Sequence, residues 1–182
     1  MIRTGIFGGS FNPIHNGHIA LARQMVEKGR LDEVWFMVSP QNPLKKQDDL
    51  APDDVRLEWA REALKDEPQL LAKDYEFHLP RPSYTWKTLQ ELKKDFPQHE
   101  FVLIIGADNW VNFNRWAHHD DILKAYSILV YPREGYDMSA ATLPKNVLLV
   151  DTPLYNVSST QIRKLLKEGK SVDGLVPKGL KL

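Results

Sequence analysis

The chain has 182 residues, 24 basic and 24 acidic side chains, a formal net charge of zero and no cysteine. Balanced charge argues against general nucleic-acid binding, and the lack of cysteine excludes disulfides and thiolate chemistry. The length predicts a single domain over residues 1–182 with a full hydrophobic core. The sequence opens on a predicted strand and contains no apolar run of membrane-spanning length, so we expect a cytoplasmic protein without a membrane partner.

The first strand-to-helix turn is the strongest functional signal in the sequence. Residues 8–18 read GGSFNPIHNGH, between a predicted buried strand over residues 2–7 and a predicted helix that ends near Gly29. Two glycines would let a ligand approach the backbone, and the free N–H groups at the start of a helix attract a phosphate. His15 and His18 share a helix face and can donate hydrogen bonds to phosphate oxygens. A tight turn with two surface histidines is the alternative that this motif alone leaves open.

Other phosphate and metal motifs are absent from the sequence. It contains neither GxGxxG nor GxxxxGK[ST], and it lacks the zinc pattern HExxH. Two histidines three residues apart supply too few ligands for a metal ion. Residues 118–121, His-His-Asp-Asp, are interpreted as a solvated helix start, because adjacent side chains point apart on a helix. We therefore expect no metal site built by protein side chains.

Continuous apolar runs predict the buried strands of a parallel sheet. They lie at residues 34–38, 101–105, 128–131 and 147–150, while residues 70–79 are interpreted as a strand near a sheet edge. The strand–helix–strand order of the first forty residues predicts a right-handed βαβ unit. The predicted fold class is therefore α/β, a Rossmann-like open parallel sheet with helices on both faces.

A helix is predicted to begin at Pro52, a residue that suits the first helical turn. Its apolar face is expected from residues at helical spacing: Val55, Trp59 and Ala63, flanked by Leu57, Ala60 and Leu64.

Polar groups follow the predicted strand ends, where open α/β sheets place their ligands. Lys45, in the loop over residues 40–49, can reach a phosphate or simply be solvated. Asp108 stands at the tip of the strand over residues 101–105, directly after Gly106. There it can bind ribose hydroxyls or a metal, or it can cap the next helix.

Two later segments predict further binding groups. Ser83 or Thr85 is expected to cap a helix whose free N–H groups could bind a carboxylate. Aromatic residues follow Asp108, and they are either core residues or partners for a flat ring: Trp110, Phe113 and Trp116.

Residues 157–163, VSSTQIR, form a second candidate anion site. Three hydroxyls stand at the predicted helix start, from Ser158 to Thr160, although one suffices for a cap. Arg163 lies one turn further and can aim its guanidinium at what the hydroxyls hold. Leu165 and Leu166 are expected to face inward.

Together, the motifs GGSFNPIHNGH and VSSTQIR resemble the nucleotidyltransferase superfamily that carries [HT]xGH near the start and [ST]SSTxxR near the end. Within it, the phrase over residues 106–108, the turn over residues 83–85 and Trp116 resemble bacterial nicotinate-nucleotide adenylyltransferases. The resemblance covers nearly the whole chain. It implies adenylyl transfer from ATP to nicotinate mononucleotide, giving deamido-NAD and pyrophosphate.

The resemblance also implies roles for the matching residues. Contacts to the triphosphate and a catalytic role are implied for His15, His18 and Arg163. Further ATP contacts are implied for Gly8, Gly9, Ser10, Phe11, Gly17, Gly106, Asp108, Ser158, Ser159 and Thr160. Acceptor contacts are implied for Lys45, Ser83, Tyr84, Thr85, Trp116 and Arg133. In these roles, amides of the turn over residues 83–85 take the nicotinate carboxylate, Trp116 stacks on the pyridine, and Arg133 lies near the acceptor phosphate.

The implied reaction is an in-line attack of the acceptor phosphate on the α-phosphorus of ATP, with Mg²⁺ bound mainly through the ATP phosphates. Two segments depart from the family pattern. Residues 43–45 read Pro-Leu-Lys where relatives often carry Pro-His-Lys, and residues 176–180 replace a closing helix with a VxxYI-like pattern. These departures leave open the role of the loop and of the tail.

Two alternatives remain at this point, and a homo-oligomer is left open. The fold could transfer a nucleotidyl group to another acceptor such as pantetheine phosphate, but then the turn over residues 83–85 and Trp116 would have no role. A nucleotide-binding module without turnover would need affinity only, which the intact His15, His18 and Arg163 argue against.

Overall fold

The computed structural model describes residues 1–44, 48–138 and 142–182. The described residues contain a six-stranded parallel sheet with the order β3-β2-β1-β4-β5-β6. Its strands are β1 (Ile2–Gly9), β2 (Glu33–Val38), β3 (Leu70–Lys73), β4 (His99–Gly106), β5 (Ser127–Tyr131) and β6 (Val147–Leu149). The helices are α1 (Asn16–Lys28), α2 (Asp53–Ala63), α3 (Thr85–Asp95), α4 (Ala107–Val111), α5 (His119–Ala125) and α6 (Ser159–Lys167), with 3₁₀ turns η1 (Tyr75–His78) and η2 (Phe113–Arg115).

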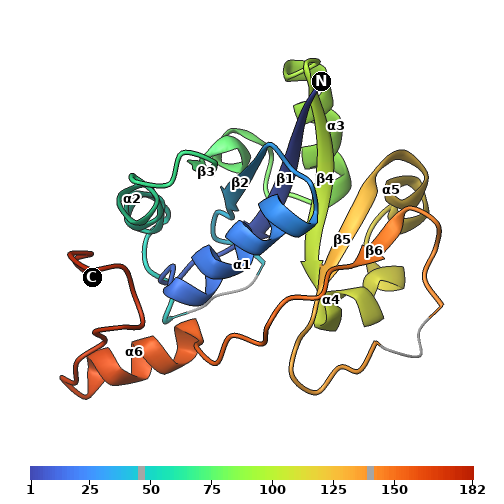
Figure 1. Ribbon diagram of the computed structural model, residues 1–182. Coiled ribbons are helices and arrows are strands. Elements are labelled where there is room, and N and C mark those ends of the chain that lie inside the picture. Colours follow the sequence, from blue (N-terminus) through green and yellow to red (C-terminus); the bar gives the residue numbers. More distant parts are fainter. Residues whose placement is uncertain (45–47, 139–141) are drawn as a thin grey trace.

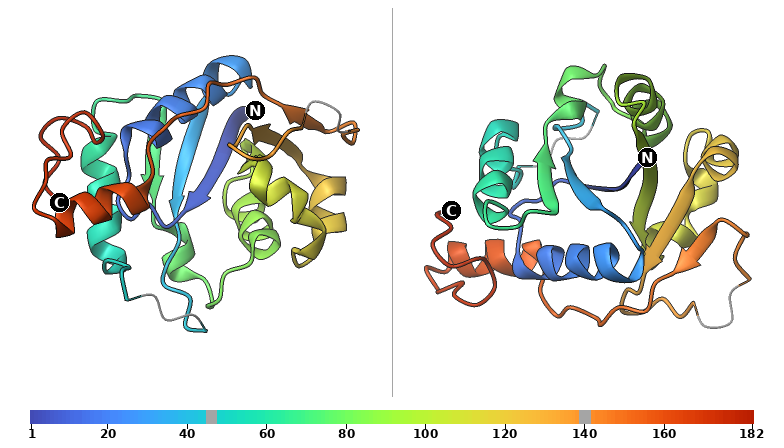
Figure 2. Two further views of the ribbon diagram at one scale, coloured as in Figure 1. Left: turned by 90° about the horizontal axis from the view of Figure 1, so that it is seen from below. Right: turned by 45° about the horizontal axis from the view of Figure 1, so that its top comes forward.

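Helices cover both faces of the sheet (Figures 1 and 2). One core joins α1 and α2 to the sheet, with Met25 and Ala60 packed near Phe36. The other core joins α3 and α5 to the opposite face, with Leu89 and Ile122 as fully buried members. Alternate residues along each strand supply the two cores because successive side chains point to opposite faces. The predicted Rossmann-like α/β class is confirmed.

Strand order reverses between β1 and β4, which lie side by side in the middle of the sheet. From β1 the chain moves outward to β2 and β3, and from β4 it moves in the other direction to β5 and β6. Ligands of open α/β sheets bind at such a switch point, outside the carboxyl ends of the strands. The turns that leave β1 and β4 therefore open into the same space.

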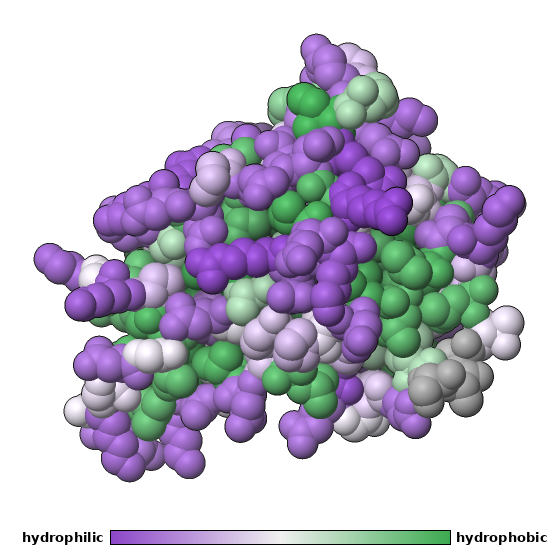
Figure 3. All heavy atoms as spheres, in the orientation of Figure 1, coloured by the Kyte–Doolittle hydropathy of each residue, from purple (hydrophilic) through white to green (hydrophobic). Residues whose placement is uncertain are grey.

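The structure corrects the expected extent of two segments. The predicted strand over residues 70–79 is an edge strand, as expected, but it ends at Lys73 and continues as η1. β6 is also an edge strand, and Leu148 within it is exposed, so this strand is not buried on both faces. In the space-filling view, hydrophobic residues gather over β6 between hydrophilic neighbours (Figure 3).

Two helices bury the expected residues only in part. Leu57, Ala60 and Leu64 of the expected α2 face are buried, and Trp59 and Ala63 are partly buried against the core. In α2 the buried residues are Arg56, Leu57 and Ala60, whereas Val55 and Trp59 line a shallow groove beside Leu180 of the C-terminal segment. In α6 the buried residue is Ile162, and Leu166, which was expected to face inward, is exposed. No helix in the described part of the chain is long and apolar enough to cross a membrane.

Candidate active site

His15 and His18 cap helix α1 reciprocally. The His15 ring accepts the backbone N–H of His18 at Nδ1, at 3.2 Å, and the His18 ring accepts the backbone N–H of His15 at its own Nδ1, at 3.1 Å. The two rings stack with their centroids 3.6 Å apart. Because each Nδ1 is an acceptor, the proton of each neutral ring lies on Nε2. Both residues thus keep one N–H donor that the helix cap does not use.

The surroundings of both histidines favour the neutral rings. Burial, and after it the positive charge of Arg133, lower the pKa of His15 to about 4. Desolvation lowers the pKa of His18 well below its usual value, and the charges of His15 and Arg133 act in the same direction. A bound triphosphate would oppose this by attracting positive charge. Without a bound anion, both rings are therefore neutral near pH 7.

Helix α6 docks on the turn between β1 and α1. The hydroxyl of Ser159 donates to the carbonyl of Pro13 at 2.8 Å. Arg163 donates from Nη1 to the carbonyl of Asn12 at 2.9 Å and from Nη2 to Oγ1 of Thr160 at 3.2 Å. The two anion motifs predicted separately from the sequence therefore form one site.

Glycine at position 17 is required by this close docking. A Cβ there would lie 2.6 Å from Cγ1 of Val157 and 2.9 Å from Cε1 of His15. Real Cβ atoms do not approach so closely, so any other residue would push the start of α1 away from the segment before α6. Among the cap residues of α6, Ser158 accepts the backbone N–H of Gln161 and is the N-cap.

The first turn of α1 has fewer free N–H groups than the sequence predicts. The N–H of His18 is used by the His15 ring, and that of Asn16 donates to the carbonyl of Leu175 at 2.8 Å. The Asn16 side chain also donates to the carbonyl of Gly174. The C-terminal segment, which was left without a role, thus covers part of the helix start, and Gly17 supplies the amide that stays available within the described residues.

The other predicted residues of the first turn divide between site and core. Gly8 and Ser10 are exposed, and Gly9 is partly exposed beside the Phe11 ring. Phe11 is 3% exposed with φ at 47°, and its ring packs edge-on against Phe7 and His18. The Phe11 ring therefore packs against His18 within the core, and its backbone is the part that a ligand can reach.

Asp108 and Arg133 face each other at the ends of β4 and β5. The distance from Nε of Arg133 to Oδ1 of Asp108 is 3.9 Å, with both side chains partly exposed. The N-cap of α4 is Gly106, so Asp108 does not cap this helix. A Cβ at Gly106 would lie 2.5 Å from Oδ1 of Asp108 and 3.0 Å from the Tyr131 ring, so a larger residue there would displace the Asp108 carboxylate. Burial raises the pKa of Tyr131 to about 12.

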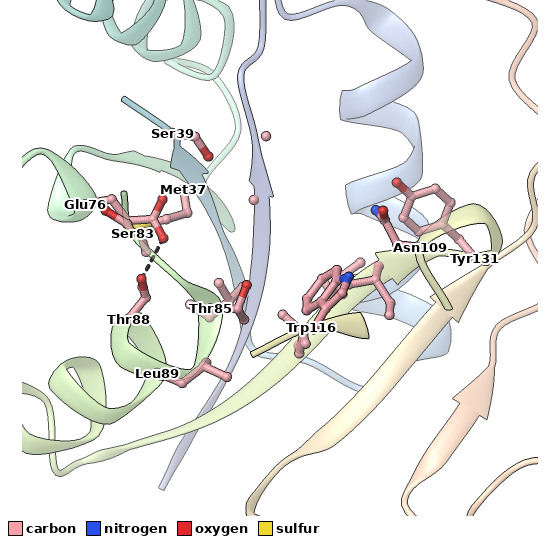
Figure 4. Close-up of a pocket in the computed structure, with 16 residues that line it drawn as sticks. Met37, Ser39, Glu76, Ser83, Thr85, Thr88, Leu89, Asn109, Trp116 and Tyr131 are labelled. Atoms are coloured by element: carbon pink, nitrogen blue, oxygen red, sulfur yellow. Dashed lines mark hydrogen bonds between the residues drawn. The ribbon is translucent and has the colours of Figure 1, made fainter. Parts of the chain in front are cut away.

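A cavity of about 210 Å³ lies beside the turn between β1 and α1 (Figure 4). Met37, Ser39, Glu76, Ser83, Thr85 and Thr88 lie on one side of it, and Asn109, Trp116 and Tyr131 lie on the other. Gly8 and Gly9 also line it. The turn over residues 83–85 and Trp116 are distant in the sequence and were both predicted as acceptor contacts. The structure brings them to opposite walls of one cavity next to β1.

The start of α3 differs from the expected cap. The N-cap is Tyr84, no side chain caps the helix, and neither Ser83 nor Thr85 does so. Tyr84 is 56% exposed and does not line the cavity, unlike its neighbours Ser83 and Thr85. An uncapped helix start leaves its first amides to water or a ligand. Lys45, also expected at the acceptor, lies outside the described residues.

Sequence reasoning missed three buried polar residues that hold these turns. Arg56 is fully buried and donates to the carbonyls of Ser10 and Ser39. The Asn12 side chain bridges the backbones of Asp49 and Ala51. Glu76 accepts the hydroxyl of Thr88 at 2.7 Å, and burial raises its pKa. The one available signal was Arg56 itself, an arginine on the same helix face as Ala60.

In the described ranges, no group of three or more His, Cys, Asp or Glu side chains is placed to hold a metal ion. The polar groups described at the switch point are mainly N–H and guanidinium donors. A site with a donor-lined turn, an arginine and an adjoining cavity with an aromatic wall fits a nucleotidyltransferase of the Rossmann-like type.

Comparison with known proteins agrees with this class. Residues 6–165 match the cytidylyltransferase-like family model. A Bacteroides fragilis protein named "Probable nicotinate-nucleotide adenylyltransferase" is 52% identical over 170 residues, covering 93% of this chain and 85% of the relative. A Cytophaga hutchinsonii protein of the same name is 47% identical, covering 97% of this chain and 92% of the relative. The chain belongs to the cytidylyltransferase-like family and, within it, to the nicotinate-nucleotide adenylyltransferases.

The fold is also similar to a solved structure of lower identity. The nicotinic acid mononucleotide adenylyltransferase of Plasmodium falciparum, complexed with NaAD, superposes with a TM-score of 0.80 at 18% identity. The match covers 98% of this chain and 92% of that chain. At this identity the likeness concerns the arrangement of strands and helices over nearly the full length.

Proposed function

We propose that this protein transfers the adenylyl group of ATP to nicotinate mononucleotide. An oxygen of the acceptor phosphate attacks the α-phosphorus of ATP, the bond from that phosphorus to the β-phosphate oxygen breaks, and pyrophosphate leaves. The product is nicotinate adenine dinucleotide. The observation that carries the proposal is the docking of Ser159 and Arg163 on the carbonyls of Pro13 and Asn12, in a turn whose Gly8 and Gly9 line the cavity walled by Trp116.

The chain's own groups act on charge and position in this proposal. Nε2–H of His15 and His18, the Gly17 amide and Arg163 would donate to the triphosphate, where negative charge grows on the leaving pyrophosphate. The remaining first-turn residues and Ser158 to Thr160 would bind the nucleotide through backbone and hydroxyl groups. Asp108 would accept ribose hydroxyls, and Arg133 beside it would hold an acceptor phosphate.

We further propose Mg²⁺ as the cofactor, held mainly by phosphate oxygens and water. The donor-rich character of the site fits this arrangement, because its groups bind anions and the described residues offer no carboxylate cage. A divalent ion bound in this way neutralises charge on the phosphates.

The acceptor is recognised by two different features of the cavity. The Trp116 ring can stack on a pyridine but does not distinguish nicotinate from nicotinamide, since both rings offer the same face. The uncapped amides at the start of α3, next to Thr85, favour a carboxylate over an amide because they offer only donors. We therefore propose nicotinate mononucleotide rather than nicotinamide mononucleotide.

A pyrophosphate-release assay tests the proposal with ATP and three acceptors: nicotinate mononucleotide, nicotinamide mononucleotide and pantetheine phosphate. The expected result is a preference for nicotinate over nicotinamide mononucleotide in kcat/KM on the order of a thousandfold, as for a site built for polar matching. Equal use of the two pyridine nucleotides would contradict the acceptor assignment. Turnover with pantetheine phosphate alone would show that the acceptor is not a pyridine nucleotide.

A further inference from the structure

A fully buried cation lies behind the phosphate-binding turn. The side chain of Arg56, on α2, is 0% exposed and donates from Nη1 to the carbonyls of Ser10, at 2.8 Å, and Ser39, at 2.7 Å. Its Nε donates to the carbonyl of Ala51 at 2.8 Å. A buried guanidinium is costly unless its donors are satisfied, so these carbonyls are held in fixed positions relative to α2.

Asp53, one turn earlier on α2, is the charge partner of Arg56. Its Oδ1 accepts Nη2 of Arg56 and the backbone N–H of Gln41 at 2.9 Å. Its Oδ2 lies 3.2 Å from Nη1 of Arg81. One carboxylate thus joins two arginines, one from behind the ATP turn and one from the loop that leads to α3.

Arg81 stands two residues before Ser83, which lines the acceptor cavity with Thr85. The ion pair therefore fixes the loop immediately before the turn on which the acceptor's carboxylate is proposed to bind. Helix α3 itself has a separate anchor, since Thr88 donates to Glu76 at 2.7 Å on the same side of the cavity (Figure 4). Loss of the Arg81 contact would then shift the turn without detaching the helix.

We propose that Arg81 is a positioning residue for the acceptor: through Asp53 and Arg56 it holds the turn over residues 83–85 at a set distance from the ATP turn at Ser10. The inference rests on the proposed function for the identity of the two substrates. It assigns Arg81 no contact with either of them. In-line attack demands a near-fixed separation of the acceptor phosphate and the α-phosphorus, so small shifts of one turn reduce productive binding.

The test compares Arg81→Ala with Arg81→Lys and with Arg61→Ala. Arg61 is a matched control, because its ion pair with Asp74 spans 3.9 Å and its side chain is 56% exposed. Arg81→Ala is expected to raise the KM for the acceptor by up to about fivefold, the size that a partly exposed ion pair can supply, while the KM for ATP changes by less than about 1.5-fold. Arg81→Lys should recover most of the loss, because an ammonium can still pair with Asp53. The melting temperature should stay near that of the wild type, because partly exposed ion pairs contribute little to stability.

A double-mutant cycle with Asp53→Asn separates positioning from direct contact. The asparagine retains an oxygen for Arg56 but loses the charge that Arg81 needs. If Arg81 acts through Asp53, the double variant should raise the acceptor KM no more than the larger single effect. The proposal would be overturned if the fold-changes in acceptor KM from the two single substitutions multiplied in the double variant. It would also be overturned if Arg81→Ala had the same acceptor KM as Arg61→Ala.

The assay also keeps this proposal distinct from the proposed function. If the wild-type protein turns over a different acceptor, the proposed acceptor is wrong. The same variants are then measured with the acceptor that the protein uses. A selective rise in that acceptor's KM would still support Arg81 as a positioning residue, and its absence would overturn it.

Discussion

Each motif histidine uses one ring nitrogen in the helix cap and leaves Nε2 outside the cap. Because the cap of α1 uses Nδ1 of both rings, a substitution can remove the outer donor and keep the cap. Asparagine places an amide group roughly where Nδ1 lies, and glutamine places one roughly where Nε2 lies. This distinction turns His18 into a test of function against structure.

We predict that His18→Asn loses activity while keeping stability. It retains an acceptor for the His15 N–H but lacks the outer donor, so kcat should fall about a hundredfold, as when one preorganised donor is removed. His18→Gln places its amide closer to the position of Nε2 and can still reach the His15 N–H as in a capping box, so it should retain more activity than His18→Asn. Steady-state kinetics and urea unfolding measure both. The reverse ranking of activities would show that His18 serves only the helix.

The free enzyme should lose stability as the pH falls from 6.5 to 4. The pKa of His15 is about 4 in the folded chain against 6.5 for an unperturbed histidine, so in this window the unfolded chain binds a proton that the folded chain does not. The contribution approaches about 1.4 kcal/mol per pH unit, and the lowered pKa of His18 acts in the same direction. Urea unfolding across this window measures the slope.

His15→Asn is the matched variant for this pH dependence. It keeps an N-cap side chain that accepts the His18 N–H, and it does not titrate. Its stability should therefore fall less steeply between pH 6.5 and 4 than that of the wild type. Parallel slopes for the two proteins would contradict the assignment of the effect to His15.

At the scale of elements, the site depends on how the start of α6 meets the turn after β1. Arg163 uses two nitrogens at once, one for the carbonyl of Asn12 and one for the hydroxyl of Thr160. A planar guanidinium can hold both and still present further donors to a phosphate. An ammonium is a point charge without this fork.

Arg163→Lys should therefore lower kcat/KM for ATP by about tenfold or more despite the conserved charge. Lys164→Ala is the control, since Lys164 is the exposed next residue of the same helix. Near-wild-type activity of Arg163→Lys would mean that only local charge matters. Unfolding curves of the two variants will show whether docking of α6 is retained.

On the scale of the whole molecule, the cavity proposed to bind the acceptor combines segments that are distant in sequence. Residues from β1, the start of α3 and the segment after η2 meet there, with Trp116 as the aromatic wall. We predict that Trp116→Ala raises the KM for nicotinate and nicotinamide mononucleotide alike, by about tenfold or less, since stacking is worth little more than 1 kcal/mol. Their ratio should stay nearly constant.

Trp110→Ala provides the comparison for Trp116→Ala. Trp110 stacks on Phe113, 5.4 Å between ring centroids, and does not line the cavity. This variant should leave both acceptor KM values close to those of the wild type. A Trp116→Ala variant that changes the ratio of the two acceptors would indicate that the ring, and not the α3 amides, reads the carboxylate.

Local patterns in the sequence determined the positions of most strands and the class of fold. They also identified the residues that form the two predicted anion motifs. Apolar runs such as residues 101–105 identify a strand buried on two faces because each face meets a helix layer. The motif residues form the two turns because glycine, histidine and hydroxyl side chains act on backbone groups only a few residues away. The role of each residue toward a substrate remains a prediction.

Only the tertiary structure decided how these pieces fit together. Ser159 and Arg163 bond to carbonyls 146 and 151 residues earlier, and no periodicity in the sequence encodes such a pairing. The same holds for Arg56, whose donors are satisfied by carbonyls of two separate loops, and for α2, whose Val55 and Trp59 turn toward the C-terminal segment. Side-chain spacing specifies a helix face, but which face is buried depends on what the rest of the chain packs against it.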